Sequence, residues 1–156
     1  MVQKIILVDS TFDLINNLDI INDKQNKIIT VDHDVHKKLD EKNIQHSVSE
    51  IFIDNLKLKK IEAESIKFTN WCNNQEIKNI LSYNEIEIGE LFRLEFHNFL
   101  IPFIKKNYEL HEIKKEFNEF QIICSSSFYH IVKNIFKNVK KIDDNNRNII
   151  LEDDKI

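Results

Sequence analysis

The sequence predicts an α/β fold in which helices cover both faces of a sheet. Short, continuous apolar runs alternate with segments of helical periodicity, and such runs are typical of strands buried in parallel sheets. The length of 156 residues fits one domain, and a hydrophobic fraction of 42% can supply a full core. We therefore expect residues 1–156 to form a single three-layer Rossmann-like sandwich, with a mostly parallel sheet of about five to six strands.

The first strand–helix–strand unit opens the chain. The run Lys4–Asp9 (KIILVD) predicts a buried strand that ends in a carboxylate. Ser10 or Thr11 can then cap a helix that begins near Phe12. The run Lys27–Val31 (KIITV) predicts the second strand.

Two aspartates and two histidines follow within the stretch VDHDVH, residues 31–36, which could form a metal site or the start of a helix. Asp32 is a good N-cap, and the spacing of Val35 and Leu39 predicts a helix over His33–Lys42. Each residue thus has a structural role, and spacing identifies no further ligand for zinc. We predict the end of a strand and the beginning of a helix here, followed by a third strand over Ile44–Val48.

The middle of the chain is mainly helical. A helix is predicted over Asn55–Cys72, and Ile80–Ile88 combines strand-like and loop-like features. Gly89–Phe117 has the strongest helical periodicity, with four phenylalanines on one stripe. Pro102 lies within it, so we expect a kink or a break there.

The last segment returns to strand–helix alternation. Phe120–Cys124 (FQIIC) predicts a buried strand, and the serines at Ser125–Ser127 can cap the helix that follows. Val139–Ile142 and Asn148–Leu151 are candidate final strands.

Composition excludes several classes of function. A net charge of -4, with mixed acidic and basic residues, argues against a nucleic-acid partner. No apolar run is long enough to span a bilayer, and two distant cysteines are too few for a disulfide framework. The single glycine, Gly89, leaves no phosphate-cradling loop, so we predict no nucleotide cofactor.

Polar residues at the strand ends define a candidate ligand-binding rim. In open parallel sheets, ligands bind at the carboxyl ends of the strands. Seven residues are expected near that edge: Asp9, Ser10, Asp32, His33, His46, Ser125 and Ser126. Each of them can also serve as a cap or turn residue, and none is assigned as catalytic or as a metal ligand.

The segment Ile80–Ile101 (ILSYNEIEIGELFRLEFHNFLI) combines a tyrosine, a short EIEIGEL turn and a long aromatic helix. It resembles the N-terminal region of two-domain, B-type glycosyltransferase-like proteins of surface-polysaccharide biosynthesis, including relatives of CDP-glycerol glycerophosphotransferases. The unit ITVDHDVHKKL and the segment KNIQHSVSEIFID are similar to the same region. The resemblance extends from Lys4 to about Leu151.

This resemblance implies two Rossmann-like domains that face each other across a cleft. A C-terminal domain would bind the nucleotide-activated donor, and this chain would be the N-terminal domain that shapes the acceptor side. The acceptor would be a glycan or a polyol phosphate. The chain would be inactive alone and cytoplasmic, or located at the inner face of the membrane. Its end in LEDDKI, directly after a strand-like run, fits a domain of a longer protein.

Two other functions are compatible with the residues. One is a non-catalytic flavodoxin-like or receiver-like module that binds a protein partner; Asp9 fits a receiver, but a phosphorylatable aspartate after the third strand is missing. The other is a small metal-dependent hydrolase that uses Asp32, His33 and His36.

Overall fold

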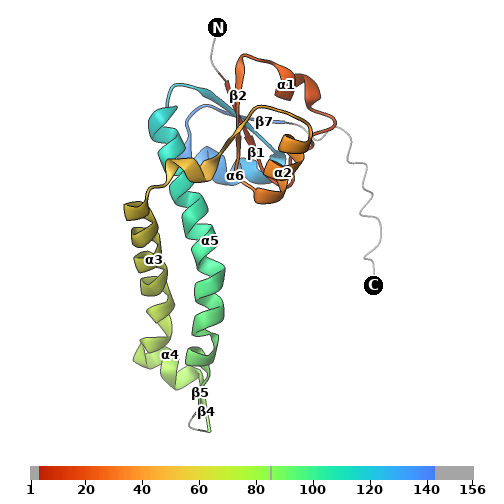
Figure 1. The fold of residues 1–156 in the computed structure, drawn as a ribbon. Helices are drawn as coiled ribbons and strands as arrows, with labels where there is room; N and C mark the ends of the chain where they lie inside the picture. Colours follow the sequence, from red (N-terminus) through yellow and green to blue (C-terminus); the bar gives the residue numbers. More distant parts are fainter. Residues whose placement is uncertain (1–3, 85, 143–156) are drawn as a thin grey trace, which may run out of the picture. The chain divides into compact units, whose positions relative to one another are not determined.

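The computed structural model describes residues 4–84 and 86–142, which divide into two compact units. The sheet unit comprises residues 1–49 and 116–156, of which 4–49 and 116–142 are described. The helical unit comprises residues 50–115. We expected residues 1–156 to form a single domain. In the structure the sheet belongs to one unit and the two long helices belong to the other (Figure 1).

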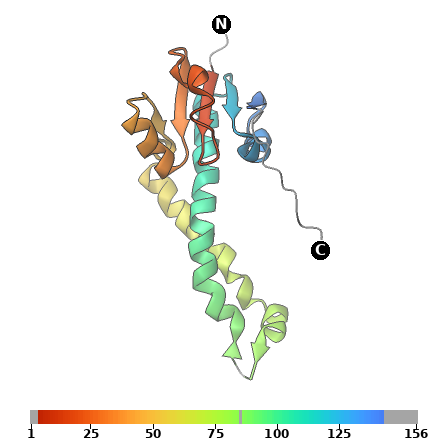
Figure 2. The ribbon, with the colours of Figure 1, turned by 90° about the vertical axis from the view of Figure 1, so that its right-hand side faces the viewer.

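The sheet unit contains a five-stranded sheet in which every pairing is parallel. From one edge to the other the strands are β3 (Ser47–Val48), β2 (Asn26–Thr30), β1 (Lys4–Val8), β6 (Gln121–Cys124) and β7 (Val139–Lys141). Figure 2 shows β2, β1 and β6 side by side in orange, red and cyan. The predicted parallel α/β fold is confirmed.

Helices cover both faces of this sheet. α1 (Leu18–Asn22) and α2 (His33–Glu41) connect β1 to β2 and β2 to β3, and α6 (Ser126–Ile135) connects β6 to β7. The chain moves toward one edge through α1 and α2, and toward the other edge through α6. Right-handed crossovers therefore place α6 on the face opposite α1 and α2, which gives three layers.

Apolar side chains fill the space between these layers. β1 contributes to both faces, because successive side chains of a strand point to opposite sides of a sheet. On one face, sheet residues and residues from the α1 and α2 side form one core cluster: Ile6, Val8, Phe12, Leu14, Ile21, Ile28, Val35, Leu39 and Ile123. Burying one such large aliphatic side chain stabilises the fold by about 1.5–3 kcal/mol.

The helix expected from Phe12 onward forms only at Leu18. Asp13 is the reason, since its Oδ1 accepts the backbone N–H groups of Ile15 and Asn16, each at 3.0 Å. Such local side-chain bonds offer the backbone an alternative to helical hydrogen bonds. Thr11, one of the two expected caps, contacts Ser125 and Ser127 after β6 instead.

The helical unit consists of two long helices and short connecting elements. Its elements are η1 (Ser49–Phe52), α3 (Asn55–Thr69), η2 (Asn70–Asn73), α4 (Gln75–Ile80), β4 (Ser82–Tyr83), β5 (Ile86–Glu87) and α5 (Ile88–Glu116). β4 and β5 form an antiparallel hairpin, so the ambiguous segment Ile80–Ile88 is part strand and part turn.

α3 and α5 are joined by polar contacts in an antiparallel pair. Lys57 Nζ lies 3.3 Å from Glu112 Oε2, and the Tyr108 hydroxyl donates to Glu64 Oε1 at 2.7 Å. That hydrogen bond, together with burial, raises the pKa of Tyr108. Hydrogen bonds from Lys115 and Lys57 lower the pKa of Glu112 despite partial desolvation. These contacts fix the register of the two helices.

α5 continues through Pro102 without a break, so that part of the expectation is wrong. The phenylalanine stripe predicted on this helix is largely exposed: Phe92, Phe99 and Phe103 are 58%, 69% and 62% accessible. The phenylalanines therefore lie on a helix, as predicted, but their side chains are not buried in a core. The expected strand over Asn148–Leu151 falls outside the described residues.

Candidate functional site

The loops after β1 and β6 meet at the carboxyl edge of the sheet. β1 pairs with both β2 and β6, and the chain leaves β1 toward β2 but leaves β6 toward β7. This reversal of direction is the topological switch point, where ligands bind in open α/β sheets. Asp9 follows β1 and Ser125 follows β6, so both lie at the switch point.

Four side chains, two from the loop after β1 and two from the N-cap and first turn of α6, form a hydrogen-bonded cluster. Thr11 Oγ1 donates to Asp9 Oδ2 at 2.7 Å and lies 3.1 Å from Ser125 Oγ, and it is also hydrogen-bonded to Ser127. Thr11 has one hydroxyl hydrogen, so it can donate to only one of these partners at a time, and in the contact with Ser127 either hydroxyl can be the donor. Ser125 Oγ also accepts the Phe128 N–H at 3.2 Å and so caps α6. We call Asp9, Thr11, Ser125 and Ser127 the switch-point cluster.

One atom of this cluster is unsatisfied. Asp9 Oδ1 is buried and has no hydrogen-bond partner among the described residues. A buried acceptor without a donor costs about 1–3 kcal/mol. Asp9 also influences Cys124 at the end of β6. Burial raises the pKa of the Cys124 thiol to about 12, and the charge of Asp9 adds to this increase. An additional hydrogen-bond donor at Oδ1 would therefore stabilise this edge.

Other predicted rim residues have structural roles or lie apart from the cluster. Ser126 Oγ donates to the Ile142 carbonyl at 2.9 Å, beyond β7. Asp32 caps α2 by accepting the N–H groups of Asp34 and Val35 at 3.0 and 3.3 Å, as predicted. Ser10 and His33 are exposed and take no part in the switch-point cluster.

His46 precedes β3, which begins at Ser47. The pairing of Ser47 with Ile29 places His46 level with Ile28 in the middle of β2, and its side chain contacts His36 and Asp40 of α2 rather than the switch-point cluster. A hollow of about 850 Å³ opens at the amino edge of the sheet, lined by the first residues of β1 and β2, by the segment Lys42–Ser47 and by Phe117 and Phe120. The third predicted strand is shorter than expected because Ile44 and Gln45 belong to the turn that leaves α2.

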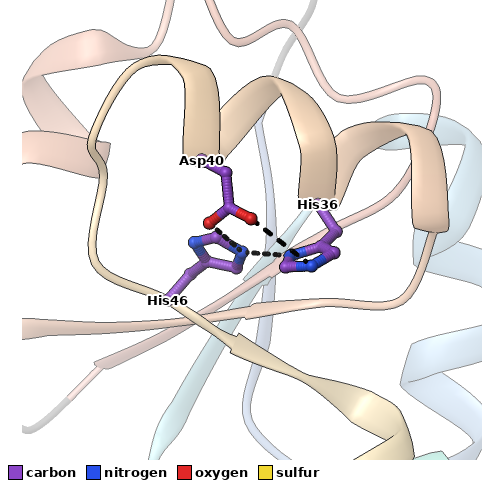
Figure 3. A group of neighbouring side chains, drawn as sticks. All are labelled: His36, Asp40 and His46. Carbon is purple, nitrogen blue, oxygen red and sulfur yellow. Dashed lines mark hydrogen bonds and ion pairs between the residues drawn. The ribbon is translucent and has the colours of Figure 1, made fainter.

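His46 joins two residues of α2 in a second group. Figure 3 shows the side chains of His36, Asp40 and His46 directed toward one another. His36 Nδ1 and His46 Nε2 are 2.7 Å apart, and the Asp40 carboxylate oxygens lie 3.5 Å from His36 Nε2 and 3.8 Å from His46 Nε2. The predicted set of Asp32, His33 and His36 does not form, because Asp32 caps the helix.

Asn43 determines the return of the chain from α2. Its φ of 53° is left-handed, and the bonds Ile44 N–H to Leu39 O and Asn43 N–H to Asp40 O, each 2.9 Å, define a Schellman motif. Asn43→Val is expected to destabilise the protein by about 1–2 kcal/mol, because a β-branched residue resists this conformation. Asn43→Gly should preserve stability. Thermal unfolding of both variants checks this, and equal melting temperatures would contradict it.

Sequence reasoning missed Thr11, Ser127 and Asp40 as members of these groups. Asp40 lies four residues after His36, a spacing that places both on one side of a helix, so a local signal existed. Thr11 and Ser127 had no such signal, because they are 116 residues apart and meet only through the pairing of β1 with β6.

The fold and the switch-point cluster define a Rossmann-like α/β protein. In the Rossmann order, the second and third strands lie on the same side of the first, as β2 and β3 do here; in flavodoxin-like order they flank the first strand. Comparisons of the chain with family models, curated proteins and solved structures give no match. Within residues 4–84 and 86–142, no helix is long and apolar enough to cross a membrane.

Proposed function

We propose that this chain is the acceptor-side domain of a glycosyltransferase-like or glycerophosphotransferase-like enzyme of cell-surface polysaccharide synthesis. The observation that carries the proposal is the buried, unpartnered Asp9 Oδ1 at the switch point. A ligand hydroxyl that donates to this oxygen would satisfy it, and hydrogen bonds to charged groups contribute about 1.5–3 kcal/mol.

The chemistry of the cluster favours a polyhydroxylated ligand over a phosphate. The hydroxyls of Thr11 and Ser127 are exposed. Thr11 donates to Asp9 and can accept from a ligand, whereas Ser127 can donate or accept, and this combination suits several sugar or polyol hydroxyls. The Asp9 carboxylate would repel an anion placed beside it. The phosphate of a polyol-phosphate acceptor would therefore point away from Asp9, and a nucleotide-activated donor would bind elsewhere.

The donor site belongs, in this proposal, to a C-terminal nucleotide-binding domain of the same polypeptide. The resemblance of Lys4–Leu151 to two-domain transferases supports this arrangement, and the single glycine of the chain agrees with it. The enzyme would work in the cytoplasm or at the inner face of the membrane. The isolated chain would then bind an acceptor without catalysing transfer.

Chemical-shift titration of the ¹⁵N-labelled chain tests the proposal. Glycerol 3-phosphate and a short oligosaccharide serve as acceptor probes, and UDP-glucose and CDP-glycerol as donor probes. At least one acceptor probe is expected to shift the backbone amides of residues 9–11 and 125–127. Asp9→Asn should weaken that binding by about tenfold or more, since a charged hydrogen bond is lost.

The control is Asp19→Asn, which removes an exposed carboxylate on α1 and should bind the same probe as the unmodified chain does. Two outcomes would contradict the proposal. The first is the absence of shifts at these amides with either acceptor probe. The second is binding of a donor nucleotide at the switch-point cluster.

A further inference from the structure

We infer that His36, Asp40 and His46 form a binding site for a divalent transition-metal ion, with Zn²⁺ as the matching ion. One potential ligand atom from each residue lies within 4.8 Å of those of the other two. Two imidazoles and one carboxylate are a ligand set found in zinc sites that keep a coordination position open. None of the three residues belongs to the switch-point cluster, so the two sites are distinct.

The fold brings the three residues together by two local devices. His36 and Asp40 are one helical turn apart on α2, which places both on the same side of the helix. The Schellman motif at Asn43 then reverses the chain and directs His46 back toward that side. Two ligands are therefore held by a regular helix and the third by a turn of defined geometry.

His46 is oriented as a metal ligand by its own backbone contact. Its Nδ1 lies 2.7 Å from the Ile44 carbonyl oxygen, which can only accept, so Nδ1 carries the hydrogen. Nε2 is then the ring nitrogen that faces His36 and Asp40. Metal-ligating histidines usually donate their second N–H to a carbonyl or carboxylate in this way.

Burial divides the group into a fixed ligand and two adjustable ones. The His46 side chain is only 4% exposed, whereas those of His36 and Asp40 are 33% and 62% exposed. Two imidazole nitrogens bound to a tetrahedral zinc ion lie about 3.4 Å apart. The His36 ring must therefore move outward by less than 1 Å from its present 2.7 Å contact, which its exposure permits. Solvent would complete the coordination on the open side.

Zinc titration of the tag-free chain tests this inference. Isothermal calorimetry with Zn²⁺ alone is expected to show one equivalent bound. His36→Ala and Asp40→Ala should each lower the affinity by at least tenfold, because each removes one of three ligands. His33→Ala is the matched control: this exposed histidine lies on the same helix but outside the group, so its removal should leave the affinity unchanged.

A second measurement locates the ion without relying on variants. Zn²⁺ is expected to shift the ring ¹⁵N resonances of His36 and His46 and to leave those of His97, His111 and His130 in place. Binding of less than one equivalent, equal losses in His33→Ala and His36→Ala, or unchanged ring resonances of His46 would each overturn the inference.

Discussion

Leu7→Ala is expected to lower the free energy of unfolding by about 2–5 kcal/mol. Leu7 lies in the central strand β1, its side chain is fully buried, and both neighbouring strands pair with β1. Shortening the side chain removes apolar contacts and leaves a cavity that a sheet held on both sides cannot close. Urea denaturation followed by circular dichroism measures the change.

Ile15→Ala is the matched comparison, since this aliphatic side chain belongs to the same unit but is 73% exposed. Its removal should change stability by no more than about 0.5 kcal/mol. If the two variants lost similar amounts, β1 would not be the centre of the core that the structure describes.

Cys124 is expected to resist alkylation in the folded protein. Its pKa is raised by burial, and secondarily by Asp9, from the reference 9.0 to about 12. Since only the thiolate reacts, a shift of about 3 reduces the reactive fraction at mildly alkaline pH by roughly a thousandfold. Iodoacetamide labelling of the Cys72→Ala chain, followed by intact mass, should therefore be at least a hundredfold slower in buffer than in urea.

The same group makes stability depend on pH. The folded state favours the neutral thiol, so its stabilising contribution is complete below the reference pKa of 9.0 and is lost as pH rises toward about 12. The free energy of unfolding of Cys124→Ala, measured by denaturation at increasing pH, should not show this part of the decrease. Labelling in buffer as fast as in urea, or identical pH profiles for both proteins, would contradict the prediction.

Local patterns predicted the strands and most helices because both depend on neighbours in the sequence. Runs such as KIILV and QIIC are continuously apolar and buried after their first residue, which suits strands covered on both faces. Asp32 was identified as the N-cap of α2 because capping needs only a short polar side chain at the right offset. The missed start of α1 also has a local cause, since the side chains of Asp13 and Asn17 form hydrogen bonds with nearby backbone groups.

The candidate sites were only partly predictable, because they depend on which strands become neighbours. Asp9 and Ser125 were expected at the carboxyl edge, yet nothing in the sequence placed β1 beside β6. His46 was expected at the same edge, but β3 begins at Ser47 instead of Ile44, and the register places His46 level with Ile28 in the middle of β2. Its contact with His36 and Asp40 then follows from the turn at Asn43.

The sequence by itself determined the alternation of strands and helices, the parallel α/β class and the caps, since each is set by side chains a few positions apart. Only the tertiary structure decided that Thr11 meets Ser127, that Asp9 Oδ1 lacks a partner and that the phenylalanines of α5 are exposed. These features depend on strand order and packing between distant segments, and local periodicity carries no information about either.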